Sequence, residues 1–486
     1  MICISVTPGS RQLAKVDMLN ASRHCDMIEL CLDHLVKEPD VGDLLKGVGK
    51  PVLVSCRREQ DGGQWKGNEE DRIALLRQAI VSGPEYVELE LDIAKSIPRF
   101  GDTKRVVSYT SLNKPLGNVD AVFTEAAEAS ADVVKFTWPT PNLDAAWPLL
   151  VAVSKKRKLP VVGMGLGQAS LMFSLMGRKY ASPWIYAALE KGMEAHPGQA
   201  TVWELDEIYR WREIGSQTRF IGVIGTSDAE TVAARVLNAA FDKLGINFRC
   251  LPITLGKTDK LEKMLEILKI NTLILNPDTG SKLLSLAQHQ EEAVDEGSYA
   301  DLLLKQPDGW HAYNMIWRSL NSSIEKTLKA ASQNERPLDR RSVMIAGSYS
   351  VTQAVTYGIT RRNSVVSVTS PNDAAAQRLS KMFNVRHVQF SNLYDTYADV
   401  IIVVDSSIEI GRSKSHFNPG YFRENMTAVD ITDLPNRTEI LREAEERSCR
   451  VVEPADILAE QLSAIFKAIT GKELSDDVLR ESMASE

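Results

Sequence analysis

The sequence of 486 residues lacks several features that would place a protein at a membrane or on nucleic acid. No apolar run reaches the roughly 18–20 residues that a helix needs to cross a bilayer. The first six residues, MICISV, have no basic segment and resemble a strand, so we expect no signal peptide. The net charge is −7, which gives no electrostatic attraction to nucleic acid or to an anionic membrane. We therefore expect neither as a partner.

The sequence also has few cysteines, and none of its six forms a CxxC pair. A structural zinc site would need such paired spacing, so we expect no metal. Most of the cysteines lie in apolar, strand-like runs, which is typical of small buried side chains in a reducing compartment. These features favour a cytoplasmic protein. Low-complexity segments and internal repeats are absent as well.

The composition is that of a globular protein, with 44% apolar and 25% charged residues. The chain is too long for one hydrophobic core, so we expect more than one domain. In the first 215 residues, short apolar runs alternate with segments of helical period such as 68–82 and 143–156. The apolar runs are residues 2–6, 27–33, 51–57, 86–92, 105–110, 133–138, 160–166 and 183–189. Eight strands with crossover connections predict a (β/α)₈ TIM barrel over residues 1–217.

In such a barrel the chemistry lies at the carboxyl ends of the strands. The polar residues in or after these runs are therefore candidates: Ser5, Glu29, Asp33, Arg57, Glu90, Thr110 and Lys135. Lys135 lies inside an apolar strand, where burial would lower its pKa and make it an amine nucleophile toward a carbonyl. The alternative is a lysine that points to solvent or pairs with Glu29 or Glu90.

A different pattern begins after the polar joint 215–218. Strands are expected at 220–225, 249–254 and 272–276, and helices at 230–244, 260–268 and 313–331. A second βα series follows, with strands at 343–346, 365–369, 385–390, 400–404 and 427–431. The pattern predicts a two-lobed α/β unit, with one lobe at 218–335 and a Rossmann-like lobe at 336–486. Its last helix, 454–471, is expected to return to the first lobe, and the polar tail after Glu473 to fray.

Several motifs of the barrel occur together in a specific order. They are MIELCLD at 27–33, PVLVSCRREQDGG at 51–63, the strand around Lys135, and AHPGQ at 195–199. With these motifs the first 215 residues resemble type I 3-dehydroquinate dehydratase, a Schiff-base lyase of the shikimate pathway. The resemblance implies that Lys135 forms an imine with the C3 ketone of 3-dehydroquinate. It places Glu29, Arg57 and Gln199 at substrate-binding positions, and Asp61 where the family has a glutamate.

Three positions depart from that family. Thr110 stands where the family has its general acid–base histidine, and loss of such a group costs about 10²–10⁴-fold. Ser174 aligns with the carboxylate-binding arginine, and a hydroxyl does not replace a bidentate clamp. Cys31 stands where the family has a second arginine. Two residues could compensate: Arg178, one helical turn after Ser174, and His196, in the loop expected to cap the site.

The second half has motifs of its own, namely FIGVIG at 220–225, NAAF at 238–241, DGWHAYN at 308–314 and ILAEQ at 457–461. In this order residues 219–472 resemble shikimate dehydrogenase. Because they directly follow the barrel, the whole chain resembles the bifunctional dehydratase–dehydrogenase fusion of aromatic amino acid biosynthesis. That resemblance implies NADP as cofactor and a shikimate-pathway metabolite as ligand.

The resemblance also shows which working residues of the dehydrogenase are replaced. Thr231 and Ala233 stand for the serine pair that binds the shikimate carboxylate, and Thr279 and Ile316 for the catalytic lysine and aspartate. Lys282 lies three residues too late. The glycine-rich turn keeps only Gly347, and the basic residue expected within 369–372 is missing. We therefore predict that NADP does not bind. Asn238, Asn314 and Gln461 are retained, and each could equally be a structural hydrogen-bonding residue.

These features leave three hypotheses. The first is a degenerate fusion enzyme with weak or absent dehydratase activity and an inactive dehydrogenase half. The second is a non-catalytic relative that binds a metabolite or partner as a regulator or scaffold, and the third is a lyase with an altered substrate. Convergence of Arg57, Lys135 and Arg178 would favour a lyase. A barrel mouth filled by Trp138, Met172 or Phe173 would favour the non-catalytic protein.

Overall fold

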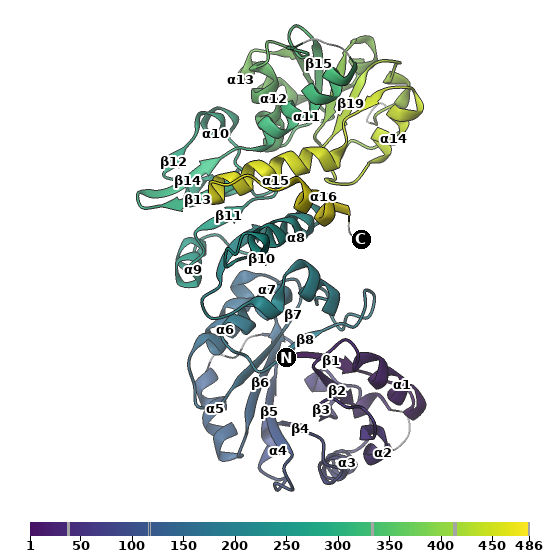
Figure 1. Ribbon diagram of the computed structural model, residues 1–486, viewed down its shortest axis with the longest axis vertical. Coiled ribbons are helices and arrows are strands. Elements are labelled where there is room, and N and C mark those ends of the chain that lie inside the picture. The colour runs from purple at the N-terminus through teal and green to yellow at the C-terminus, as the bar shows by residue number, and fades with distance from the viewer. Residues whose placement is uncertain (36–38, 115, 117, 332–334, 412–415, 485–486) are drawn as a thin grey trace. The chain divides into compact units, whose positions relative to one another are not determined.

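The computed structural model describes residues 1–35, 39–114, 116, 118–331, 335–411 and 416–484 (Figure 1). The chain forms two compact units. The first contains residues 1–218 and 251–259, and the second contains residues 219–250 and 260–486. Within the described residues, no helix combines the length and the apolar character that crossing a bilayer requires.

The first unit is built on a sheet of eight parallel strands, so the barrel predicted from the apolar runs is confirmed. The strands are β1 (Ile2–Val6), β2 (Met27–Cys31), β3 (Val52–Ser55), β4 (Tyr86–Glu90), β5 (Lys104–Thr110), β6 (Val133–Pro139), β7 (Val161–Leu166) and β8 (Ile185–Ala187). Each strand from β1 to β7 pairs with the next in sequence, and β8 pairs with β1. The two ends of this order, β7 and β8, contact each other, which brings the sheet round on itself.

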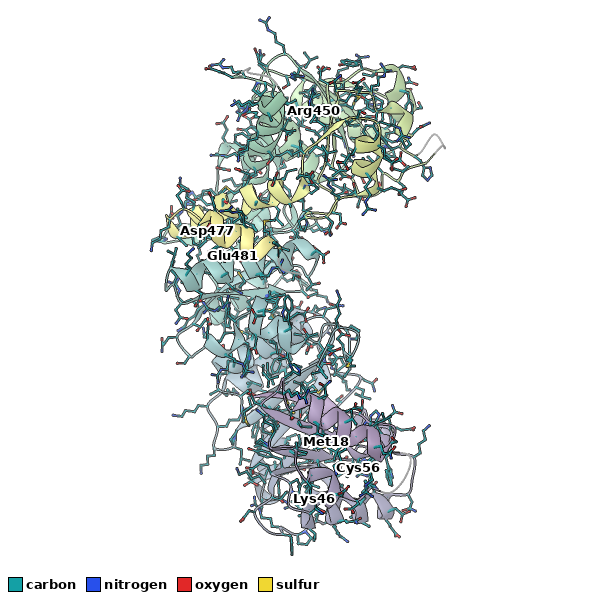
Figure 2. All side chains as sticks on the ribbon, turned by 45° about the vertical axis from the view of Figure 1, so that its right-hand side comes forward. Met18, Lys46, Cys56, Arg450, Asp477 and Glu481 are labelled. Atoms are coloured by element: carbon teal, nitrogen blue, oxygen red, sulfur yellow. The ribbon has the colours of Figure 1, made fainter. Side chains whose placement is uncertain are left out.

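Helices surround this sheet, as Figure 1 shows. They are α1 (Arg11–Ala21), α2 (Val41–Leu45), α3 (Glu69–Val81), α4 (Leu91–Ala94), α5 (Val119–Glu128), α6 (Leu143–Ser154) and α7 (Ser170–Lys179). Asparagine side chains before α3, α5 and α6 accept a backbone hydrogen bond from the first turn, which fixes where these helices begin. Met18 of α1, labelled in Figure 2, is fully buried. After β8 there are only short helical turns, η3 (Glu204–Ile208) and η4 (Trp211–Glu213).

The barrel interior follows from the alternation of side chains along each strand. At the amino ends of the strands the interior is apolar, and its buried cluster includes Cys3, Met27, Leu53, Val106, Val133, Val162, Trp184 and Tyr186. Two residues further along β2, β4 and β6, the same face carries Glu29, Glu88 and Lys135. The apolar layer therefore fills the barrel near the amino ends of the strands, and the charged side chains lie next to it on the side of the carboxyl ends.

The second unit begins with a six-stranded sheet and its helices. These are β9 (Arg219–Ile224), α8 (Asp228–Lys243), β10 (Phe248–Ile253), α9 (Leu261–Leu268), β11 (Thr272–Ile274), β12 (His289–Gln290), α10 (Glu292–Gly297), β13 (Leu302–Gln306), β14 (Gly309–Tyr313) and α11 (Ile316–Ala331). The strand order is β10-β9-β11-β13-β14-β12, and β13 is antiparallel to β11 and to β14. The helix expected over 313–331 begins only at Ile316, because residues 309–313 form strand β14.

The second lobe has six parallel strands. Its elements are β15 (Ser342–Ala346), α12 (Ser350–Thr360), β16 (Val365–Thr369), α13 (Asp373–Phe383), β17 (Arg386–His387), β18 (Val400–Val403), β19 (Thr427–Asp430), α14 (Glu439–Glu446) and β20 (Arg450–Val451). The order β17-β16-β15-β18-β19-β20 is that of a doubly wound dinucleotide-type sheet, which confirms the predicted Rossmann-like lobe. In such a sheet the order reverses between the first and fourth strands, here β15 and β18, and ligands bind beside that point.

Helix α15 (Pro454–Thr470) contacts α8 and α11 and so returns to the first lobe, as expected. The expectation that the tail frays is wrong. Residues 476–484 form helix α16 (Asp476–Ala484), which packs on α8. Asp477 and Glu481, labelled in Figure 2, are exposed, while Val478 and Ser482 are buried. A single buried face therefore orders a segment whose composition is mostly polar.

Candidate active site

Lys135 lies at the centre of a charged cluster inside the barrel. Its side chain is 1% exposed, and its Nζ atom donates a hydrogen bond to Glu88 Oε2 at 2.8 Å. Glu29 Oε1 is 3.8 Å from the same ammonium. The burial considered for Lys135 is therefore present. Of the two acids named as alternative partners, Glu29 lies close to it and Glu90 pairs with Arg72.

Arg57 joins both carboxylates from the mouth side. Its Nε and Nη2 atoms donate to Glu88 at 3.2 and 2.9 Å, and Nη2 also pairs with Glu29. Ser5 Oγ donates to the other oxygen of Glu29 at 2.5 Å. Two carboxylates thus face one ammonium and one guanidinium, so the buried charges balance and their polar atoms are bonded to one another.

The pKa values in this cluster follow from burial and from the two charge pairs. Burial is the largest cause that lowers the pKa of Lys135; the charge of Arg57 lowers it further, and Glu88 opposes both. Burial alone would raise the pKa of Glu88, but the charges of Arg57 and Lys135 bring it well below its usual range. Glu88 is therefore an anion at neutral pH. Lys135 is an amine that loses its proton more readily than an exposed lysine, as imine formation requires.

The loop after β3 holds Arg57 in place. Asp33, which is buried, accepts the backbone N–H groups of Arg57 at 3.1 Å and of Gln64 at 2.8 Å. Gly63 packs so closely against this turn that a Cβ atom would lie 2.1 Å from the carbonyl oxygen of Arg57. Glycine at position 63 is therefore a steric requirement for the bend that aims Arg57 at the cluster.

Asp61, Gln199 and His196 were expected at the site, but each bonds to a residue outside the Lys135 cluster. Asp61 pairs with Arg58 at 2.6 Å. Gln199 is buried and its Oε1 accepts the Ala195 N–H at 2.7 Å, which closes its own loop. His196 Nδ1 accepts the N–H of Gly167 at 3.3 Å, directly after β7. This contact places the loop at the barrel mouth, and burial lowers the pKa of His196.

The position of Arg178 does not allow it to compensate for the missing arginine. Helix α7 starts after the carboxyl end of β7 and runs back toward the amino ends of the strands, about 1.5 Å per residue. Arg178 lies near its far end, where its guanidinium stacks 5.1 Å from the ring of Trp211 and its charge acts on the Met1 amino group. A side chain that leans back by one turn does not reach the mouth from there, so Arg178 lies at the end of the barrel opposite the site.

Two residues proposed as plugs of the mouth lie outside the barrel interior. The ring of Trp138 packs on Phe136 at 5.4 Å, and Phe136 packs on Phe123 of α5. Phe173 of α7 faces Gly163, where a Cβ atom would lie 2.2 Å from its ring. Both aromatic side chains therefore fill the layer between strands and helices. Met172 is also fully buried.

Glu88 is the residue of this cluster that the sequence analysis missed. It lies two residues before Glu90 on the same strand, so period-two alternation could have identified it. Glu90 itself pairs with buried Arg72 of α3 at 2.8 Å, and burial raises its pKa to about 7. The partner of Lys135 on β4 is thus Glu88, one pleat deeper in the barrel than the candidate Glu90.

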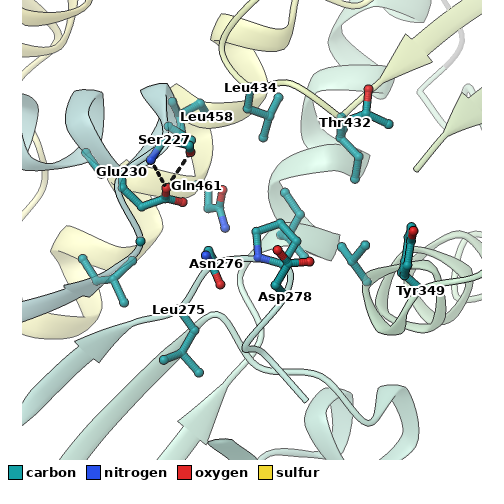
Figure 3. A pocket seen from close by; sticks show the side chains of 18 of the residues that line it. Ser227, Glu230, Leu275, Asn276, Asp278, Tyr349, Thr432, Leu434, Leu458 and Gln461 are labelled. Carbon is teal, nitrogen blue, oxygen red and sulfur yellow. Dashed lines mark hydrogen bonds between the residues drawn. The ribbon is translucent and has the colours of Figure 1, made fainter. Parts of the chain in front are cut away.

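The second unit contains a cavity of about 910 Å³ between its two lobes (Figure 3). The figure shows Ser227 and Glu230 on one side, Tyr349 on the other, and Gln461, Asn276 and Asp278 between them. The complete lining includes Ala233, Lys282, Ile316, Ser348, Thr432 and Asp433. The cavity thus presents a methyl group at 233 and an aliphatic side chain at 316, where the dehydrogenase resemblance called for a serine and an aspartate.

The three retained polar residues of this half have mainly internal partners. Asn238 is fully buried in α8 and accepts the Cys250 N–H at 2.8 Å. Asn314 is also fully buried, and its Nδ2 donates to the Ala293 carbonyl at 3.4 Å. Gln461 lines the cavity but donates to buried Asp301 at 2.9 Å. Asp301, which the sequence analysis did not select, also accepts the Met315 and Ile316 N–H groups at 2.8 and 2.7 Å and so caps α11.

The turn after β15 carries side chains where a phosphate would approach the backbone. A Cβ atom on Gly347 would lie 2.8 Å from Thr352 Oγ1, so this glycine is needed for packing within the turn. Ser348 Oγ donates to Asp405 at 2.8 Å, and Tyr349, half-exposed, stands directly before α12. All three residues after Gly347 line the cavity. The turn therefore does not have the open glycine backbone of a pyrophosphate site.

We predict that Asp301→Asn lowers the stability of the second unit by about 1–3 kcal/mol. The three N–H donors around Asp301 leave no acceptor for an amide NH₂ group, so at least one buried donor loses its partner. Urea unfolding at pH 7.5 tests this, with exposed Asp295→Asn of α10 as the control, which should change stability by less than about 0.5 kcal/mol. Equal midpoints for both variants would contradict the capping role.

Comparison with known proteins agrees with the order of the two units. The family model described as type I 3-dehydroquinase matches residues 2–216. The chloroplastic bifunctional 3-dehydroquinate dehydratase/shikimate dehydrogenase of Arabidopsis thaliana is 22% identical, over 97% of this chain and 82% of that protein. The 3-dehydroquinate dehydratase of Methanocaldococcus jannaschii is 27% identical, over 44% of this chain and all of that protein.

Among solved structures, the shikimate dehydrogenase from Aquifex aeolicus matches 56% of this chain and all of its own, with 20% identity and a TM-score of 0.49. The dehydroquinate dehydratase and shikimate dehydrogenase from S. pombe matches all of this chain and 98% of its own, with 15% identity and a TM-score of 0.45. Residues 2–216 thus match the type I 3-dehydroquinase family model, and the chain as a whole resembles the bifunctional 3-dehydroquinate dehydratase/shikimate dehydrogenase.

Proposed function

We propose that the barrel binds 3-dehydroquinate, or a closely similar keto acid, as an imine of Lys135, and that it dehydrates this ligand slowly. The observation that carries the proposal is the buried Lys135 ammonium, 2.8 Å from Glu88 and close to Arg57. Desolvation makes the amine available, and an imine withdraws electrons from the adjacent carbon so that its proton can leave. Glu29 and Arg57 are the polar groups next to that position.

Binding of 3-dehydroquinate tests the ligand class. Calorimetric titration of the whole chain should show saturable binding that is weakened at least about tenfold in Arg57→Met, because a charge-assisted bond is lost. Arg58→Met is the matched control, since Arg58 pairs with Asp61 and Asp92 away from Lys135. Equal affinity of both variants for 3-dehydroquinate would show that Arg57 does not bind the ligand.

We further propose that the second unit has no shikimate dehydrogenase activity. Three replacements support this: side chains in the turn after Gly347, the missing basic residue for a 2′-phosphate, and Thr279 with Ile316 in place of the proton-transfer pair. Thr279 Oγ1 is bonded to Asn276 at 2.7 Å, and Ile316 is buried in the hydrophobic core. A bound alcohol would therefore have neither a hydride acceptor held in place nor a proton acceptor.

We predict no measurable NADP binding by calorimetry and no NADPH absorbance when shikimate and NADP are added to the protein. The physical reason is that the turn offers Cβ atoms where phosphate needs backbone N–H groups, and no cation for the 2′-phosphate. Micromolar NADP binding would overturn this prediction even without turnover, because it would show that the glycine-poor turn still holds a phosphate.

A second function class remains as the alternative: a non-catalytic metabolite-binding regulator or scaffold. One observation favours it. Both cations of the site, Lys135 and Arg57, are already bonded to Glu88 and Glu29, so the cluster is satisfied without a ligand. In that case 3-dehydroquinate would bind without forming an adduct or product.

A further inference from the structure

Two histidines and an aspartate meet on the solvent face of the first sheet of the second unit. Strand β12 pairs in parallel with β14, so that His289 lies opposite His311. Asp308 belongs to the turn that joins β13 to β14. Trp310 and Ala312 point into the core, and the alternation of β14 therefore places His311 on the outer face, where it is 21% exposed.

The ligand atoms of these three residues converge. His311 Nε2 is 2.9 Å from Asp308 Oδ1, and His289 Nε2 is 3.3 Å from Asp308 Oδ2. The two imidazole rings stack with centroids 4.4 Å apart and planes inclined by 28°. One ligand atom from each residue lies within 4.8 Å of both others. The two histidine–aspartate distances are close to the edge of a tetrahedral zinc site, which is about 3.4 Å for bonds of about 2.1 Å.

The backbone around the cluster is held by bonds of its own. Gly309 has φ of +131°, and a Cβ atom there would lie 2.5 Å from Gln288 Oε1. That oxygen accepts the Trp310 N–H at 2.6 Å. Gln288 directly precedes His289 in the sequence. The turn and β12 are therefore tied together independently of any ion, and little reorganisation is needed for the three side chains to share one.

We propose that His289, Asp308 and His311 form a binding site for a divalent transition-metal ion of the zinc class, with water at the remaining position. Two imidazoles and one carboxylate suit Zn²⁺, Ni²⁺ or Cu²⁺, whereas Mg²⁺ and Ca²⁺ prefer oxygen ligands. The ion replaces the protons through which the two imidazoles now bond Asp308. It joins β12 to the β13–β14 hairpin, so it stabilises this lobe by binding only the folded state.

Titration of the EDTA-treated, dialysed full chain with ZnCl₂ tests the site. We expect one saturable equivalent of Zn²⁺, a rise in unfolding temperature relative to EDTA, and no effect of MgCl₂. The double variant His289→Gln/His311→Gln should bind Zn²⁺ at least about tenfold more weakly, because even outer partners of a metal site contribute about 10–100-fold. His24→Gln, exposed in the first unit, is the control and should bind as the unaltered chain does.

The side chains that change are on the surface, so unfolding in EDTA should be the same for all variants and reports correct folding. Loss of zinc binding in the double variant alone supports the site. Zinc binding that is undiminished in the double variant, or absent from the unaltered chain, overturns it. In the latter case the three residues are a hydrogen-bonded surface cluster only.

Discussion

Purified protein should dehydrate 3-dehydroquinate at least about 10²-fold more slowly than the Methanocaldococcus jannaschii dehydratase, because a general acid–base group is worth about 10²–10⁴-fold. Strand β5 ends with Thr110, a half-buried hydroxyl, where the resemblance calls for histidine. A neutral hydroxyl of this kind does not accept a proton at neutral pH. The measurement is steady-state kcat from the absorbance of the conjugated product, with both proteins assayed in one buffer.

The variant Thr110→His tests the cause of the low turnover. If the missing proton-transfer group limits the reaction, this variant should raise kcat, while Thr103→His, a buried threonine before β5 on the same segment, should not. A kcat of the unaltered protein equal to that of the relative would show that the interpretation of Thr110 is wrong. His196 would then be the residue to replace, since its loop lies at the mouth beside Gly167.

Removing Glu88 should destabilise the barrel strongly, by about 3–5 kcal/mol for Glu88→Ala. Lys135 and Arg57 would then share the single carboxylate of Glu29, and one buried positive charge would lack a partner. Glu85→Ala is the matched control, because Glu85 forms a 2.7 Å pair with Lys104 that is about half exposed at both ends. Exposed pairs contribute about 0–1 kcal/mol.

Urea unfolding followed by the barrel's tryptophan fluorescence measures the difference between the two variants. If Glu88→Ala destabilises no more than Glu85→Ala, Glu88 is not needed to balance the buried charges of Lys135 and Arg57. Glu88→Gln adds a second readout. Glu88 raises the pKa of Lys135, so removing its charge lowers that pKa further and shifts the pH dependence of ligand binding toward acid.

The barrel was predictable because its signal is local. Each strand is a short apolar run between helical patterns, and all eight runs became strands. The strands β12 and β14 were not predicted: β12 has only two residues, both exposed, and of β14 only Tyr313 was assigned, to the following helix. The start of α11 is set by Asp301, which directly precedes β13. Its carboxylate accepts the N–H groups of Met315 and Ile316. Periodicity within the helix does not contain that information.

The site was predictable only in part. Lys135, Glu29 and Arg57 were named as polar residues in or after the apolar runs, and the structure brings them together. Glu88 was not named, although it alternates with Glu90; that it faces Lys135 follows from the inner face that β4 and β6 share across β5 in the barrel. Arg178 was considered because helical side chains lean toward the N-terminus of their helix, but α7 carries it too far from the mouth for that lean to suffice.

Reductive trapping with borohydride tests the central claim, that Lys135 forms an imine, most directly. The protein is incubated with 3-dehydroquinate and sodium borohydride, digested, and its peptides are analysed by mass spectrometry. We expect one stable adduct on the peptide that contains Lys135, and none in Lys135→Arg, which keeps the charge facing Glu88 but has no amine that forms an imine. An unmodified Lys135 at saturating ligand, or an adduct that persists on another lysine in Lys135→Arg, would contradict the account.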